Sequence, residues 1–156
     1  MDEPKHKDKH YYRGFLLAQF AALETTIDVY IASYFIDSDK KYDFMNIILN
    51  RLTFEAKRTA LKTILDRKTP DFVKSKNNTW PNSAFIEELR LLNNERNIFA
   101  HYVDTIKHDE SAIISLMEFR DKSKIVEYDW PKYESIVKRI LSALKKLQDD
   151  DFVKSN

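Results

Sequence analysis

This 156-residue chain lacks cysteine altogether and contains a single glycine, Gly14. The absence of cysteine excludes structural disulfides, thiolate catalysis and cysteine-built zinc sites. A phosphate-cradling loop and a hydrolase nucleophile elbow each need several glycines, so neither is expected. The sequence predicts that no stretch approaches the length of a membrane span, and the charged first ten residues have no signal-peptide core. These features predict a cytoplasmic protein that makes no membrane contact.

A large excess of charge of one sign is also missing, because 26 Lys and Arg face 25 Asp and Glu, for a net charge of +1. Any affinity for a polyanion must therefore come from a local patch. The segment 51–76 is the candidate, since its basic side chains outnumber its acidic ones. On charge pattern alone a solvated helix face is favoured over an RNA-binding surface. The basic residues of this segment predicted to contact RNA are Lys57, Arg58 and Lys62.

Apolar residues make up 43% of the chain, and 20 residues are aromatic (10 Phe, 8 Tyr, 2 Trp), which is typical of a folded protein. The length predicts a single domain. We place it at residues 12–150, between a polar tail at 1–11 and a C-terminal tail at 151–156.

Helical periodicity dominates the chain. It predicts helices over residues 12–36 and 42–52, a third from a Thr53 cap to residue 67, a fourth beginning at Trp80-Pro81 and a fifth beginning at Trp130-Pro131. Two short apolar runs within residues 112–130 flank a polar turn and predict a β-hairpin. The predicted fold is therefore mainly α, with about five helices and a β-hairpin inserted before the last one.

The same periodicity predicts which side chains are buried. In the third helix the apolar residues face inward, and Lys57, Arg58 and Lys62 face outward. In the second helix, Met45, Ile48, Leu49 and Leu52 are expected to face inward, and in the last helix Leu141 is among the residues expected on the apolar face.

The segment from Arg96 to Tyr102, near the end of the fourth helix, carries the residues suited to chemistry. The guanidinium of Arg96 can pair with a phosphate, and His101 can move a proton near neutral pH. The amide of Asn97, one turn before His101, can orient the imidazole or a substrate hydroxyl. These are the parts of an RNA-cleaving site that needs neither a metal nor another cofactor.

The pattern Arg-Asn-x-x-x-His, with alanine before the histidine and a long amphipathic helix before it, resembles the signature of the HEPN superfamily. The match is sharp over about residues 85–103. The resemblance implies an up-and-down helical bundle and a homodimer that pairs through these helices and cleaves RNA. It implies that Arg96 contacts phosphate, that His101 is the acid or base, and that Asn97 supports the geometry.

The resemblance also implies an acidic residue on the first helix, for which Glu24 ranks ahead of Asp28. Arg90, on the polar stripe of the fourth helix, joins the predicted RNA contacts. Tyr102 has no assigned role. The expected biological role is that of a toxin or defence effector, with a neutralising partner protein as a further partner.

Helix geometry leaves the site open to several arrangements, because Arg96 and His101 project roughly 140° apart on an unbroken helix at about 100° per residue. The arginine side chain could curl round, the helix could loosen near Phe99, or a second protomer could supply the missing partner. A structural alternative pairs Arg96 with Glu24 and makes His101 a cap of the helix C-terminus. The functional alternative is a non-catalytic module that binds RNA or a protein.

Overall fold

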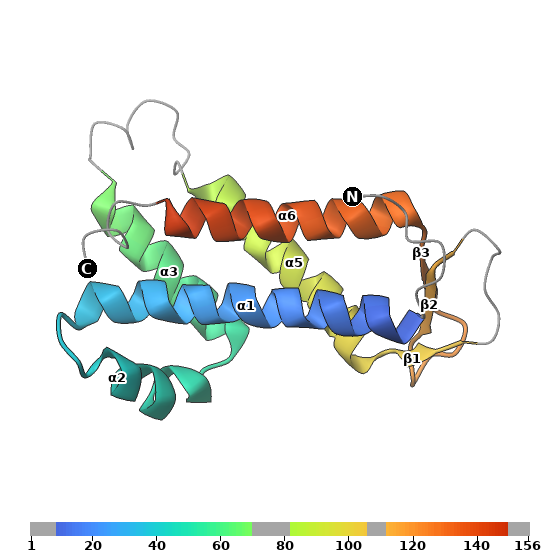
Figure 1. Cartoon of the computed structure of the whole chain (residues 1–156), viewed down its shortest axis with the longest axis horizontal. Coiled ribbons are helices and arrows are strands. Elements are labelled where there is room, and N and C mark those ends of the chain that lie inside the picture. Colours follow the sequence, from blue (N-terminus) through green and yellow to red (C-terminus); the bar gives the residue numbers. More distant parts are fainter. Residues whose placement is uncertain (1–8, 70–81, 106–111, 150–156) are drawn as a thin grey trace. The chain divides into compact units, whose positions relative to one another are not determined.

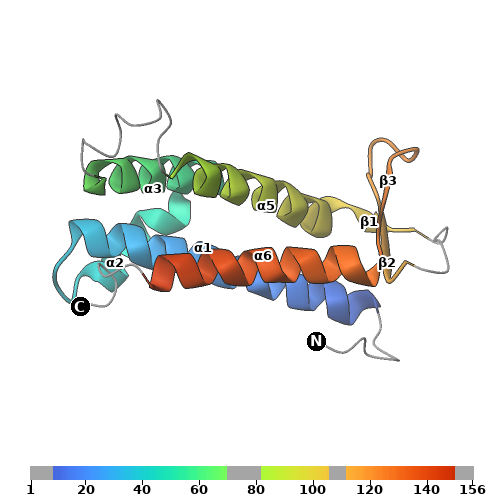
Figure 2. The same ribbon diagram turned by 90° about the horizontal axis from the view of Figure 1, so that it is seen from above.

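The computed structural model describes residues 9–69, 82–105 and 112–149 (Figures 1 and 2). Within these ranges the chain is 73% helical, with five helices and a small three-stranded antiparallel sheet before the last helix. The predicted mainly α fold with a hairpin before the last helix is thus confirmed. The predicted helix start at Trp80-Pro81 and most of both predicted tails lie outside the described residues.

The helices lie close to their predicted positions. They are α1 (Lys9–Phe35), α2 (Lys41–Ile47), α3 (Phe54–Lys68), α5 (Ser83–His101) and α6 (Trp130–Gln148), with a 3-10 turn η1 (Leu49–Arg51) after α2. The strands are β1 (Val103–Asp104), β2 (Ile114–Met117) and β3 (Ile125–Tyr128).

The chain divides into two compact units. Residues 1–21 and 92–141 form the first, which we call the sheet unit, and residues 22–91 and 142–156 form the second, which we call the helical unit. The predicted extent of a single domain, residues 12–150, stays a prediction.

The sheet unit contains the three strands in the order β1-β2-β3, and all pairs are antiparallel. The hairpin of β2 and β3 was predicted, whereas β1 was not, because a two-residue strand has no alternation to detect. Buried aromatic rings join the start of α1 to α6, and Tyr133 donates a 3.0 Å hydrogen bond to the backbone oxygen of Tyr12. Leu141 is 50% exposed, so its predicted inward position is wrong.

The helical unit confirms the predicted start of α3, where the Thr53 hydroxyl accepts a 3.3 Å hydrogen bond from the amide of Ala56. The predicted core face of this helix is also confirmed. Its buried apolar residues are Leu61, Ile64 and Leu65.

The predicted apolar face of the second helix is largely wrong. Leu49 is buried, but Ile48 and Leu52 are exposed, and no residue of α2 itself is buried. A seven-residue helix has only two turns, so few of its side chains reach a neighbouring element.

Helix α1 corrects the expectation about membrane spans, because it is long and apolar enough to qualify as one by length and composition. Core helices of globular proteins pass the same test, and 44% of the qualifying window is buried. Charged residues in α1 also bind other elements: Arg13 pairs with Asp104, and Asp28 pairs with Lys57. We therefore interpret α1 as a core helix.

Candidate functional site

The segment that carries Arg96, Asn97 and His101 is the last turn and a half of α5, in the sheet unit. The helix stays regular to its end, since the amide of Tyr102 still donates a 3.0 Å bond to the carbonyl oxygen of Ile98. The alternative in which the helix loosens near Phe99 is therefore wrong. Arg96 and His101 leave the helix in different directions, as regular geometry requires.

The Arg96 side chain nevertheless turns toward Asn97, and its Nη1 donates a 3.2 Å hydrogen bond to Asn97 Oδ1. Asn97 precedes His101 by four residues, so the two side chains are neighbours on one helix face. Arg96 and Asn97 are half-buried and His101 is exposed. Within residues 9–69, 82–105 and 112–149, no hydrogen bond or ion pair engages the imidazole. The three polar side chains thus lie at the surface, and the imidazole of His101 is accessible to a ligand.

Arg13, which sequence reasoning missed, anchors this segment from α1. Its Nε donates a 2.7 Å hydrogen bond to the carbonyl oxygen of Phe99, and its Nη2 donates one of 2.7 Å to the carbonyl oxygen of Tyr102. The last carbonyls of a helix lack intrahelical partners, and a cation is favoured there by the helix dipole. The predicted structural role of His101 as the helix cap is therefore filled by Arg13.

A signal for Arg13 was present, because it is the last basic residue of α1 and an almost wholly apolar stretch follows it. The arginine is also bound by Asp104 of β1, whose Oδ1 accepts a 3.3 Å bond from Nη1. Lys9 and His10 lie 3.6 Å from the other oxygen of the same carboxylate. The start of α1, the end of α5 and β1 therefore meet in one charged cluster.

The buried side of α5 is held by aromatic packing. Phe99 is fully buried, with its ring centroid 4.6 Å from that of Tyr128 on β3. The Tyr128 hydroxyl donates a 2.8 Å hydrogen bond to Glu95, and burial raises the pKa of the phenol, with a further contribution from the Glu95 charge. The helix that carries His101 is thus fixed on the sheet by its apolar side.

Tyr102 gains a structural position but no chemical role. Its hydroxyl donates a 3.2 Å hydrogen bond to Glu118 Oε2, just after β2. Lys124 approaches the same oxygen to 2.9 Å, and its hydrogen bond is the main cause of a lowered pKa for the Glu118 carboxyl. These contacts place the hairpin turn beside the end of α5.

Glu24 and Lys57 belong to the helical unit and bind each other. Lys57 Nζ donates 2.8 Å hydrogen bonds to Glu24 Oε1 and to Asp28 Oδ2. The lysine is 2% exposed, so the prediction that it faces outward is wrong. Burial by itself lowers the pKa of Lys57, but the bonds to the two carboxylates outweigh it and raise that pKa. The ammonium holds α1 to α3 and is not presented to a ligand.

The structural alternative for Arg96 is likewise not observed. Glu24 has its partner, Lys57, within the helical unit, whereas Arg96 has Asn97 within the sheet unit. The carboxyl of Asp28 is 5% exposed, and burial raises its pKa. Neither acidic residue of the first helix is thus presented as a free catalytic group.

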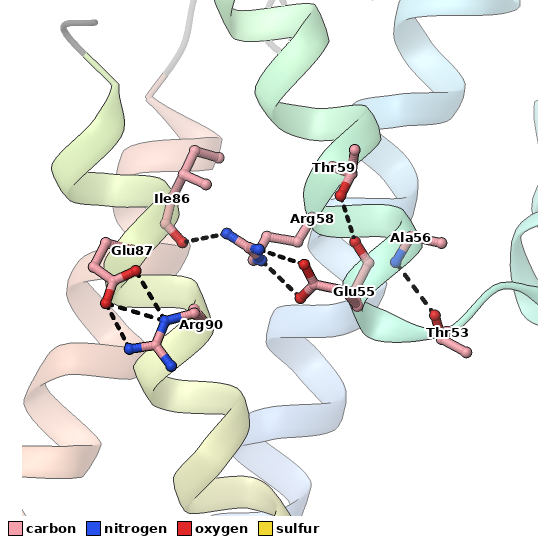
Figure 3. A network of polar contacts seen from close by, with 8 residues as sticks. All are labelled: Thr53, Glu55, Ala56, Arg58, Thr59, Ile86, Glu87 and Arg90. Atoms are coloured by element: carbon pink, nitrogen blue, oxygen red, sulfur yellow. Dashed lines mark hydrogen bonds and ion pairs between the residues drawn. The ribbon is translucent and has the colours of Figure 1, made fainter. Parts of the chain in front are cut away.

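The other predicted RNA contacts also lie in the helical unit, and each has an acidic neighbour. Arg58 binds Glu55 through two nitrogens and donates a 3.4 Å bond to the Ile86 carbonyl oxygen, while Arg90 binds Glu87 through Nε and Nη2 (Figure 3). Lys62 pairs with Asp66. Each basic residue that was predicted to contact RNA is therefore engaged by a neighbouring carboxylate.

Within the described ranges, no group of three or more His, Asp or Glu side chains is arranged to hold a metal ion. Comparison of the chain with models of protein families, with curated proteins and with solved structures finds no match.

Proposed function

We propose that this protein is a metal-independent endoribonuclease of HEPN type, cytoplasmic and active as a homodimer. One observation carries the proposal. The Arg96 guanidinium is bonded to Asn97, one helical turn from an exposed His101, at the anchored end of a regular helix. This arrangement offers a phosphate-binding cation and a proton-transfer group on an open surface.

The proposed reaction uses these groups on the ribose-phosphate backbone. His101 accepts the proton of a 2′-hydroxyl, and the 2′-oxygen attacks the adjacent phosphorus. The bond from phosphorus to the 5′-oxygen breaks, and that oxygen takes a proton from an acid. Arg96 stabilises the charge that develops on the phosphate oxygens, and Asn97 orients the imidazole. The products are a 2′,3′-cyclic phosphate and a 5′-hydroxyl.

A second copy of the chain completes the proposed site. Because α5 is unbroken, Arg96 and His101 cannot both be central on one of its faces. Pairing through the ends of two α5 helices would bring a second histidine to the two-fold axis, where it can act as the acid. Mixing wild-type protein with an excess of His101→Ala protein tests this, since mixed dimers keep only one histidine and the activity should fall more steeply than the fraction of wild-type chains.

The wider role is proposed on the resemblance alone. We propose a toxin or defence effector whose activity is held in check by a partner protein. Glu24 is left out of the mechanism, because Lys57 binds its carboxylate.

Cleavage of single-stranded RNA in excess chelator tests the enzyme proposal. The wild-type protein should cut, and His101→Ala should stop cleavage without lowering the melting temperature, because the imidazole is exposed. His10→Ala is the matched control: it removes another exposed histidine of the sheet unit, and Asp104 keeps Lys9 and Arg13 as partners. Cleavage that depends on a metal, or that survives His101→Ala, contradicts the proposal.

A second candidate is a non-catalytic module that binds a protein or RNA. The protein-binding form of this candidate is favoured by α2, in which no residue is buried and in which Tyr42 and Ile47 are 71% and 57% exposed. Apolar side chains gathered on an exposed helix are typical of interaction surfaces. This candidate predicts binding without any cleavage product.

A further inference from the structure

The turn between β2 and β3, residues 118–124, carries a strongly exposed aromatic side chain. Phe119 is 72% exposed, although a phenylalanine gains free energy by burial. The turn itself is well formed. The amide of Glu118 bonds the Lys124 carbonyl oxygen at 3.0 Å, and the amide of Lys124 bonds the Asp121 carbonyl oxygen at 3.0 Å. The phenyl ring is therefore presented by an ordered hairpin.

Two exposed cations accompany Phe119 in this turn, Arg120 and Lys122. Neither forms a hydrogen bond or an ion pair with any residue in the described part of the chain. The intervening carboxylate is engaged locally, since Asp121 Oδ1 accepts bonds from the Ser123 amide at 3.1 Å and from its hydroxyl at 2.6 Å. This differs from the surface of α3 and α5, where the predicted RNA contacts are paired with acids. The turn thus offers cations that are free to bind phosphate.

The strand register places this turn beside the catalytic segment. Val103 pairs with Met117, so the antiparallel alignment continues toward Tyr102 and His101 on one side and Glu118 and Phe119 on the other. The hydrogen bond from Tyr102 to Glu118 confirms that the two segments stay together beyond the last ladder pair. In both views the turn lies on the side of the sheet where α5 ends (Figures 1 and 2).

We propose that the hairpin turn is a subsite for single-stranded RNA, in which Phe119 stacks on a base while Arg120 and Lys122 bind phosphate oxygens. The inference rests on the proposed function, because the subsite would hold the strand next to the phosphate that His101 acts on. Stacking on an exposed ring combined with flanking cations is how proteins hold single strands without base-specific bonds. The chemistry fits unpaired RNA, since the bases of a duplex are already stacked on each other.

Binding of an uncleavable oligonucleotide tests the subsite independently of cleavage. We would measure fluorescence anisotropy of a labelled single-stranded 2′-O-methyl RNA at low salt. Loss of one stacked base is worth about 1–3 kcal/mol, so Phe119→Ala should weaken binding by about five-fold or more. Arg120→Ala combined with Lys122→Ala should weaken binding and reduce its dependence on salt.

The helical unit supplies matched controls. Tyr42→Ala removes an aromatic ring of almost equal exposure, 71%, and Lys40→Ala combined with Lys41→Ala removes two cations beside it. Both controls should bind as the wild type does. A duplex of the same sequence should bind more weakly than the single strand and should be insensitive to Phe119→Ala.

The outcomes separate the two proposals. If His101→Ala abolishes cleavage but Phe119→Ala binds the single strand as tightly as the wild type, the subsite is overturned and the enzyme stands. If no RNA is cut but Phe119→Ala still weakens binding, the subsite is supported and the endoribonuclease proposal is overturned. Wild-type protein that does not bind the single strand, or controls that weaken binding as much as Phe119→Ala, overturn the subsite.

Discussion

Arg13 Nε lies 2.7 Å from the carbonyl oxygen of Phe99, and this hydrogen bond joins the first helix to the turn of α5 that carries His101. The same guanidinium also binds the Tyr102 carbonyl oxygen. One arginine therefore binds the backbone both before and after His101. The position of the proposed catalytic residue depends on a residue more than eighty positions away in the sequence.

Arg13→Ala should loosen the end of α5. A hydrogen bond that involves a charged group contributes about 1.5–3 kcal/mol net, and water can partly replace the guanidinium at these half-buried carbonyls, so we expect a loss of about 2 kcal/mol in the free energy of unfolding. The lowered melting temperature should come with faster hydrogen exchange of the Tyr102 amide. Arg13→Lys should recover only part of the loss, because one ammonium cannot reproduce the planar fork. A variant as stable as His10→Ala would show that the cap contributes nothing.

The buried ion cluster of the helical unit leads to a second prediction. Lys57→Ala leaves the carboxylate of Asp28 buried without its cation, which should cost about 3–5 kcal/mol. Lys62→Ala, which breaks a more exposed pair with Asp66, should cost less than about 1 kcal/mol. Chemical denaturation of the two variants gives the comparison. Equal losses would mean that burial of Lys57 has no energetic consequence.

Apolar periodicity was sufficient for most of the fold. The first helix, the core face of α3 and the Thr53 cap follow from local sequence, because each depends on residues within a few positions of one another. The hairpin follows from two apolar runs around a polar turn. These features need no knowledge of what the chain packs against.

The sequence did not reveal which polar side chains bind each other when they are far apart in the chain. Lys57 was expected outside because lysine is rarely buried, but two carboxylates of α1 compensate its charge. Arg13 and Phe99 are 86 positions apart, and no local pattern links them. The sequence pointed to the residues of the proposed catalytic motif but not to those that hold this segment in place.

Gly14 gives a prediction that is independent of the site. It lies within α1, and a Cβ added there would meet no atom within 4 Å apart from its chain neighbours and the backbone of the same helix. Gly14→Ala should therefore stabilise the protein by about 0.5–1 kcal/mol, through helix propensity alone. Ala18→Gly, at another exposed position of the same helix, should destabilise it by a similar amount. Thermal unfolding of both variants measures this, and a lowered melting temperature for Gly14→Ala would contradict it.

The glutamate-arginine pairs of Figure 3 predict a dependence on pH. The pKa values of Glu55 and Glu87 are lowered, chiefly because each accepts hydrogen bonds from the arginine three residues later. When the pKa of a carboxyl is lower in the folded than in the unfolded state, where it is near 4.5, its ion pair stabilises the fold at pH values above the unfolded-state pKa. This stabilisation is lost as the pH falls through the folded-state pKa. Glu55→Gln combined with Glu87→Gln should thus lower the melting temperature at pH 7, with a difference from wild type that shrinks toward pH 3. A difference that stays constant with pH would refute the assignment.

The chemistry of the cleaved ends tests the central claim most directly. Wild-type protein would be incubated in chelator with an RNA and with the same sequence in 2′-O-methyl form, and the products would be identified by mass spectrometry. The account predicts 2′,3′-cyclic phosphate and 5′-hydroxyl ends from the RNA, no cleavage of the 2′-O-methyl strand, and no product with His101→Ala. Cleavage of the 2′-O-methyl strand, or ends that bear a 5′-phosphate, would contradict it.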